Sequence, residues 1–401
     1  MSNLWSANTP ASFWCCEPDP ADELWHEAVT AALPVLELPV AVEDAHAVAA
    51  ATLGEGQFGS DHWQLSLVKR TYYLLKPFLP RAFTVLLRQL YSRSPSTQNG
   101  LGWPVEPRYA AFLWEVMRQL LLLSGESTWA FRHFWPEGRS FAFVLTHDIE
   151  TAAGQAYMRK VADLEEQLGF RSTINFIPER YPLDYDLMGE LCERGFEIGV
   201  HGLKHDGKLF STPEEFRRRA ECINRYLAEF GAVGFRAPLT LRNPYWMQAL
   251  DLEYDLSFFD TDPYEPLPGG CMSIWPFAIG EFLELPYTLA QDCTLTAILG
   301  ETTPRLWLEK LEFIEQHFGL ALVNTHPDYL LDECTGAVYA EFLQTMCARD
   351  DYYHALPCDV ARWWRRRSAL LPDPLPAAIS SYGPEPILGQ VILDGDVIVI
   401  Q

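Results

Sequence analysis

The second part of the chain alternates short apolar runs with longer segments in which apolar residues recur at helical spacing. The first run, residues 141–146, is continuous, short and bounded, as is typical of a strand buried on both faces. Strands that alternate with helices predict βαβ units and a parallel sheet or barrel. Further strands are predicted at 172–177, 196–200, 233–236, 282–285 and 320–325, with helices between them at 156–168, 186–193, 212–230, 244–250 and 303–318.

The first 136 residues have a different texture. Apolar residues recur at helical spacing over 63–91 and again over 110–123, and a segment rich in Ser, Pro, Gly and Asn at 94–107 predicts a loop between them. We therefore expect residues 1–136 to form a mostly helical N-terminal region. Its aromatic side chains indicate packing, and the sequence assigns no chemistry to it.

The end of the chain, residues 369–401, predicts a Pro-rich linker followed by a β-hairpin. The hairpin covers 391–400 and turns at Asp394 and Gly395. On its own it would expose apolar strand edges. We therefore expect it to dock on the main body or on a partner subunit, and the second case would make the chain a homo-oligomer.

Composition narrows the class of protein. The 401 residues are 48% hydrophobic and 21% charged, which is typical of a globular chain, and the net charge is −24. Such a surface repels phosphate backbones, so we expect no nucleic-acid partner. The longest apolar run, residues 120–123, is too short to span a membrane, and the first residues show no secretory pattern. We therefore expect a cytoplasmic protein with no membrane span.

Chemically active side chains follow several of the predicted strands. In parallel α/β folds, functional residues gather at the carboxyl ends of the strands, because those ends meet at one edge of the sheet. We therefore expect five side chains at or just past strand ends to meet in one site: Asp148, Glu150, His201, Arg236 and His326.

His201 and His205 are four residues apart, just past the predicted strand 196–200. If the chain turns helical there, both imidazoles lie on one face, about 5–6 Å apart at Cβ. That spacing lets two ring nitrogens reach one metal ion at about 2.0–2.1 Å. The spacing is common, so the pair indicates a metal site only together with the acidic element 146–150 at another strand end.

The motifs that contain these residues resemble, in family order, those of the polysaccharide deacetylases of the NodB-homology type (carbohydrate esterase family 4). The resemblance covers roughly residues 137–366, and the ordered set is specific although each motif alone is not. The first motif is a variant with Glu two residues after the first Asp. The motifs are Thr146-His147-Asp148-Ile149-Glu150, His201-Gly202-Leu203-Lys204-His205, Arg236-Ala237-Pro238, the Asp-rich stretch 255–262, and Leu322-Val323-Asn324-Thr325-His326.

The resemblance implies an α/β fold, a distorted (β/α)7-type barrel, over residues 137–368. It also implies a divalent metal, usually zinc, and a hydrolase that removes N-acetyl groups from a sugar in a polysaccharide or its precursor. By motif position, Glu150, His201 and His205 would be the metal ligands. Two departures stand out, because Glu150 is one methylene longer than the usual Asp and Gly202 stands where the family has Ser or Thr.

The same resemblance implies the catalytic roles. Asp148 would be the general base, oriented and held ionised by Arg236, and His326 would be the general acid. Asp260 or Asp262 would support the charge of His326. The backbone after Arg236 would supply hydrogen-bond donors for an oxyanion.

Two other functions fit the same residues. One is an allantoinase-like amidohydrolase, which would break a different C–N bond on the same scaffold. The other is a catalytically inactive carbohydrate-binding homologue, which the departures at Glu150 and Gly202 would explain.

Overall fold

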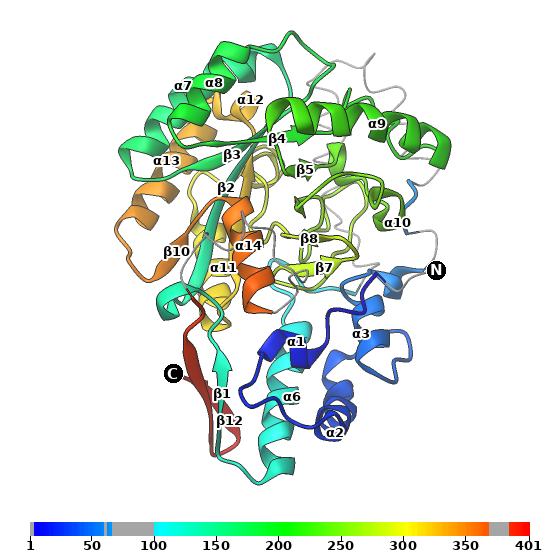
Figure 1. The fold of residues 1–401 in the computed structure, drawn as a ribbon. Coiled ribbons are helices and arrows are strands. Elements are labelled where there is room, and N and C mark those ends of the chain that lie inside the picture. Colours follow the sequence, from blue (N-terminus) through cyan, green and yellow to red (C-terminus); the bar gives the residue numbers. More distant parts are fainter. Residues whose placement is uncertain (1–3, 60–61, 66–99, 369–384) are drawn as a thin grey trace.

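The structure is a computed structural model that describes residues 4–59, 62–65, 100–368 and 385–401. Its main sheet consists of nine strands, and Figure 1 shows them curling around the centre of the upper body. These strands are β2 (Phe141–Ile149), β3 (Ser172–Phe176), β4 (Glu197–His201), β5 (Gly234–Arg236), β6 (Tyr254–Asp255), β7 (Phe277–Ile279), β8 (Phe282–Glu284), β9 (Leu320–Thr325) and β10 (Tyr352–His354).

The order of the strands is that of a barrel. They run β10-β2-β3-β4-β5-β6-β8-β7, and β9 also pairs with β2. Every pair is parallel except β7 with β8. All positions of β2 are buried, which explains its continuous apolar run.

Hydrogen bonds from the segment after β8 close the curl against β9. The backbone N–H groups of Thr288 and Leu289 both donate to the carbonyl of Leu322 at 3.1 Å. Leu289 also forms a parallel bridge with Val323. The parallel strands β2, β3, β4, β5, β6, β8 and β9 therefore form a distorted barrel, which confirms the predicted fold class.

Helices connect the strands, and local sequence signals start them. Thr212 caps the longest by accepting a hydrogen bond from the N–H of Glu215 at 3.2 Å, and Pro213 fills its first position. No helix of the described residues is long and apolar enough to cross a membrane. The helices are α7 (Ala152–Gln167), α8 (Tyr185–Glu193), α9 (Pro213–Phe230), α10 (Pro244–Met247), α11 (Arg305–Gln316), α12 (Pro327–Leu330), α13 (Glu333–Cys347) and α14 (Pro357–Arg367).

The N-terminal region lies at one end of the barrel (Figure 1) and, where it is described, consists of helices, their connections and the strand β1 (Thr128–Arg132). The predicted helix at 110–123 is present, whereas most of the periodic segment 63–91 lies outside the described residues. Aromatic rings join this region to the barrel, because Trp114 stacks on Trp275 with centroids 5.7 Å apart. Its helices are α1 (Pro10–Trp14), α2 (Asp22–Ala32), α3 (Ala45–Ala51) and α6 (Arg108–Ser124).

The predicted C-terminal hairpin is confirmed. Strands β11 (Leu388–Asp394) and β12 (Val397–Ile400) pair antiparallel, and β11 pairs with β1 (Thr128–Arg132) of the same chain. The hairpin therefore docks on its own main body. β12 is the edge strand of this small sheet. Most of the predicted linker lies outside the described residues.

Candidate active site

A pocket at the carboxyl ends of the strands contains the predicted metal-binding and catalytic side chains. His201 and Arg236 are the last residues of β4 and β5. His326 directly follows β9. Because these strands are parallel, their carboxyl ends meet at one rim of the barrel. The predicted residues that line the pocket are Asp148, Glu150, His201, His205, Arg236 and His326.

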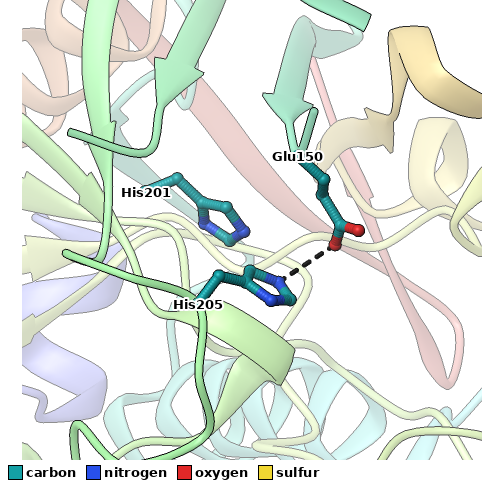
Figure 2. A group of neighbouring side chains, drawn as sticks. All are labelled: Glu150, His201 and His205. Atoms are coloured by element: carbon teal, nitrogen blue, oxygen red, sulfur yellow. Dashed lines mark ion pairs between the residues drawn. The ribbon is translucent and has the colours of Figure 1, made fainter. Parts of the chain in front are cut away.

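A tight turn, rather than a helix, brings His201 and His205 together. Gly202 has φ +63° and His205 has φ +50°, both in the left-handed region. The helical turn assumed from the spacing is therefore wrong, although the two rings still meet with centroids 5.2 Å apart. Figure 2 shows the Glu150 carboxylate pointing toward both imidazoles, with its Oε1 3.0 Å from His205 Nε2.

Gly202 lets this turn pass close to the third motif. A Cβ added at Gly202 would overlap the ring carbons of Pro238. The positive φ of Gly202 independently favours glycine. The departure from Ser or Thr at this position therefore has a packing reason, since the turn and Pro238 leave no room for a side chain.

Glu150, His201 and His205, which we call the metal-donor trio, fit a divalent metal ion. One donor atom from each residue lies within 4.8 Å of the others. His201 Nδ1 lies 3.1 Å from the carbonyl oxygen of Arg236, so Nδ1–H donates there and Nε2 keeps its lone pair. His205 Nε2 is buried and lies 3.0 Å from Glu150 Oε1. Two imidazole nitrogens and one carboxylate oxygen are a ligand set typical of catalytic zinc.

The protonation states of His201 and Glu150 also suit a metal. Burial lowers the pKa of His201 to about 4, so this ring is neutral at pH 7. Burial would raise the pKa of Glu150, but contact with His205 and the nearness of His326 and His201 hold it well below its usual range. Metal binding requires a neutral imidazole and an ionised carboxylate, which His201 and Glu150 provide.

Asp148 is a buried carboxylate held by two amide side chains. Asn175 Nδ2 donates to Asp148 Oδ1 at 3.0 Å, and Asn324 Nδ2 donates to Oδ2 at 2.9 Å. Arg236 Nη1 lies 3.5 Å from the same Oδ2. Burial would raise the pKa of Asp148, but the neighbouring histidines, Arg236 and Asn324 together hold it well below its usual range. The carboxylate is therefore ionised at neutral pH.

Arg236 lies beside Asp148, where the resemblance implied an orienting group. Its Nε donates to the carbonyl of Leu256 at 2.9 Å, while Nη1 and Nη2 are buried without a hydrogen-bond partner. Ala237, the next residue, corrects the expectation that the backbone after Arg236 donates hydrogen bonds to an oxyanion. The N–H of Ala237 donates to Ser257 Oγ at 2.8 Å, so it is already occupied and does not serve as an oxyanion donor.

His326 is paired with Asp292, a residue that sequence analysis did not single out. Asp292 Oδ1 lies 2.8 Å from His326 Nδ1, and the backbone N–H of His326 donates to Oδ2 at 2.7 Å. Burial would lower the pKa of His326, but Asp292 outweighs it and the pKa rises to about 10. The imidazole is therefore a cation at neutral pH.

Asp292 takes the place expected for Asp260 or Asp262, which corrects that prediction. Asp260 is paired instead with Lys310, with Nζ 2.7 Å from Oδ2. Asp262 accepts a hydrogen bond from the N–H of Tyr264 at 2.7 Å. Neither carboxylate is among the side chains that line the pocket. An Asp-rich stretch does not reveal which cation each carboxylate faces. Here Lys310 of α11 is the cation that pairs with Asp260.

The two amide side chains that bind Asp148 were not predicted from the sequence either. Asn324 lies near the end of β9, two residues before His326, and both side chains line the pocket. Asn175 is a buried polar residue within β3. An amide inside the mostly apolar run 320–325 was the available signal for Asn324, because a buried amide needs a hydrogen-bond partner. Asp292 had no comparable signal, since it lies in the connection after β8.

Known proteins resemble this chain in fold. No family model matches the sequence, and no curated protein sequence matches it either. A Mycobacterium smegmatis protein assigned as a polysaccharide deacetylase is similar over 63% of this chain and 95% of its own, with 19% identity and a TM-score of 0.47. A probable polysaccharide deacetylase from Pseudomonas aeruginosa PAO1 is similar over 59% of this chain and 94% of its own, with 15% identity and a TM-score of 0.46.

The PuuE allantoinase is similar over 58% of this chain and 93% of its own, with 12% identity and a TM-score of 0.45. Two of these three similar structures are thus described as polysaccharide deacetylases and the third as an allantoinase.

Proposed function

We propose that this chain is a metal-dependent deacetylase that hydrolyses an N-acetyl group of a sugar in a polysaccharide or its precursor. The observation that carries the proposal is one pocket in which ionised Asp148 and cationic His326 lie together with the metal-donor trio. Hydrolysis of an amide needs a base that takes a proton from water and an acid that protonates the leaving amine. This pocket offers both groups in the required protonation states.

The metal-donor trio would hold the metal, for which we propose zinc. Its chemistry there would be to acidify a bound water molecule and to polarise the acetyl carbonyl. The chain itself keeps His201 neutral through burial and fixes its ring through the carbonyl of Arg236. Glu150 supplies the negative charge that favours a cation over a neutral ligand.

Asp148 takes the proton of the attacking water as the new C–O bond forms at the acetyl carbon. Asn175 and Asn324 fix both of its oxygens, so the carboxylate reorients little during the transfer. Arg236 holds Asp148 ionised beforehand. The buried η nitrogens of Arg236 leave its charge available to this one carboxylate.

His326 gives a proton to the amine nitrogen as the C–N bond breaks, which releases acetate and the free amino sugar. Asp292 binds Nδ1, so the transferable proton is on Nε2 of the ring. The carboxylate of Asp292 also stabilises the imidazolium before the transfer. Asp292 therefore stabilises the charged form of the acid, as Arg236 stabilises the charged form of the base.

Acetate release from N-acetylated sugar oligomers by the zinc-loaded, full-length chain tests the proposal. We expect Asp148→Asn and His326→Gln each to lower kcat about 10²- to 10⁴-fold. Asp163→Asn is the matched control, because Asp163 is an exposed acid on α7 outside the pocket. Undiminished acetate release by Asp148→Asn, or a purified chain that binds no divalent metal, contradicts the proposal.

The same experiment separates the other two functions. A base, an acid and a metal in this arrangement also suit the opening of a cyclic amide, so the substrate panel includes small cyclic amides. If the chain hydrolyses small cyclic amides but releases no acetate from sugars, it is an allantoinase-like amidohydrolase. Binding of acetylated oligomers by the zinc-loaded chain without any turnover assigns an inactive carbohydrate-binding homologue.

A further inference from the structure

One wall of the pocket is a short segment with an unusual backbone. Residues 238–242, which we call the pocket loop, follow Arg236 and Ala237, and Leu239 and Thr240 line the pocket. Leu239 has φ +60° and Thr240 has φ +50°. Two consecutive non-glycine residues in the left-handed region are strained, and such a conformation persists only where the surroundings enforce it.

Two side chains enforce the conformation at Thr240. Arg242 Nη1 donates to the carbonyl of Thr240 at 2.9 Å, which ties the loop back on itself. The Thr240 hydroxyl donates to Glu265 Oε2 at 2.7 Å, and Glu265 lines the same pocket. The position of this wall therefore depends on Arg242, although Arg242 does not line the pocket.

Arg242 is held in turn by the N-terminal region. Its guanidinium makes two hydrogen bonds to Glu55, one of them from Nε to Oε2 at 3.1 Å. Both side chains of this ion pair are completely buried. His62 Nε2 lies 3.2 Å from the same Oε2 of Glu55, and the ring of Phe258 lies 4.7 Å from the guanidinium. A buried cation of this kind is stable only with its partner carboxylate.

A second contact connects the same two parts of the molecule. The ring of Trp103 meets Tyr264 edge-on with centroids 5.2 Å apart, and Tyr264 lines the pocket. The Thr261 hydroxyl donates to the carbonyl of Gly102 at 2.8 Å. Residues far apart in the sequence therefore support the same pocket wall at two separate points.

We propose that the N-terminal region is a positioning element of the active site, which holds the strained pocket loop in place through the buried Glu55–Arg242 pair. Glu55 and Arg242 are then positioning residues that act on substrate binding through Thr240. The effect on substrate rests on the deacetylase function proposed above, whereas the effect on the loop does not. This role explains why an N-terminal region without chemistry of its own packs against the barrel.

A double variant tests the proposal. Glu55→Leu with Arg242→Met removes both charges together, so neither is left buried alone. We expect KM for acetylated sugar oligomers to rise about tenfold with kcat within about twofold, because binding rather than chemistry is affected. Hydrogen–deuterium exchange of the pocket loop should be about tenfold faster. The zinc content should not change, since the metal-donor trio does not touch this pair.

Glu17→Gln is the matched control. Glu17 also belongs to the N-terminal region and pairs with an arginine, Arg132, at 2.6 Å, but neither residue lines the pocket. Both KM and loop exchange should equal those of the unaltered chain. Trp103→Leu provides a second variant that leaves no buried charge, and it should also raise KM by loosening Tyr264.

Unchanged loop exchange in a folded double variant overturns the proposal. If that variant does not fold, unchanged KM and unchanged exchange around Tyr264 in Trp103→Leu overturn it instead. If the unaltered chain hydrolyses no acetylated sugar, the deacetylase function fails, but the exchange measurement still decides whether Glu55 and Arg242 hold the loop.

Discussion

Asp328 accepts a hydrogen bond from the backbone N–H of Glu150, with its Oδ2 2.9 Å from that nitrogen. Its other oxygen accepts a hydrogen bond from the hydroxyl of Thr151, the residue that caps α7. Gly154 makes room for this contact, because a Cβ at that position would overlap the Asp328 carboxylate. One side chain on α12 therefore fixes both the residue proposed as the third metal ligand and the start of the following helix.

Asp328→Ala should weaken zinc binding without removing a ligand. The backbone at Glu150 would lose its anchor, and loss of a residue that orients a metal ligand typically lowers affinity about 10- to 100-fold. Competition with a chromogenic chelator measures the change. Asp332→Ala is the matched control, because Asp332 caps the neighbouring helix α13 and does not contact Glu150. Equal zinc affinities for both variants contradict the prediction.

Glu150→Asp separates an adapted site from a degenerate one. With Glu150 anchored by Asp328, its full length brings Oε1 to 3.0 Å from His205 Nε2. A side chain one methylene shorter would withdraw the oxygen, so we expect zinc affinity to fall about tenfold. Calorimetric titration of the metal-free chain checks this. A gain in affinity or in acetate release would instead indicate that Glu150 has impaired an ancestral site.

The fold could be predicted from the sequence because the barrel strands are buried on both faces. The apolar runs at 141–146 and 320–325 correspond to β2 and β9. The short strands β6, β7 and β10 were not predicted, since two or three residues carry too little pattern to distinguish a strand from a loop. Contact between the N-terminal region and the pocket loop was equally unpredictable, because nothing local relates Glu55 to Arg242.

The candidate site also contains some residues that could be predicted from the sequence and some that could not. Residues within motifs at strand ends, such as Asp148 and His326, could be selected because parallel strands bring their ends together. Residues in the connections between strands that pair with these side chains could not be selected from the sequence. Asp292, which pairs with His326, is the clearest case. Spacing alone was also misleading at His201 and His205, where a turn through Gly202 achieves what a helix was expected to do.

Gly202→Ala should destabilise the chain more than an ordinary glycine substitution. Alanine at a positive φ costs about 1–2 kcal/mol, and overlap with Pro238 adds about 1–3 kcal/mol. Gly207→Ala is the control, because Gly207 also has a positive φ, +72°, but a Cβ there would meet only Leu239, at 4.0 Å. Chemical denaturation gives both free energies of unfolding. Equal losses of unfolding free energy in the two variants would show that Pro238 can move away from the new side chain without destabilising the protein.

Asp292→Asn should move the alkaline limit of activity toward lower pH. His326 acts only while it is protonated, and with the Asp292 carboxylate beside it the pKa of His326 is about 10. Without that carboxylate, burial lowers the pKa of His326 and only the weaker effects of Glu150 and Asp148 oppose it, so the ring loses its proton at lower pH. We expect kcat at neutral pH to fall about 10²-fold and the remaining activity to decline as the pH rises. A pH profile of kcat for zinc-loaded protein, with zinc content measured in parallel, checks this against the unaltered chain. If both proteins lose activity at the same alkaline pH, Asp292 does not set the charge of His326 and another group supplies the proton.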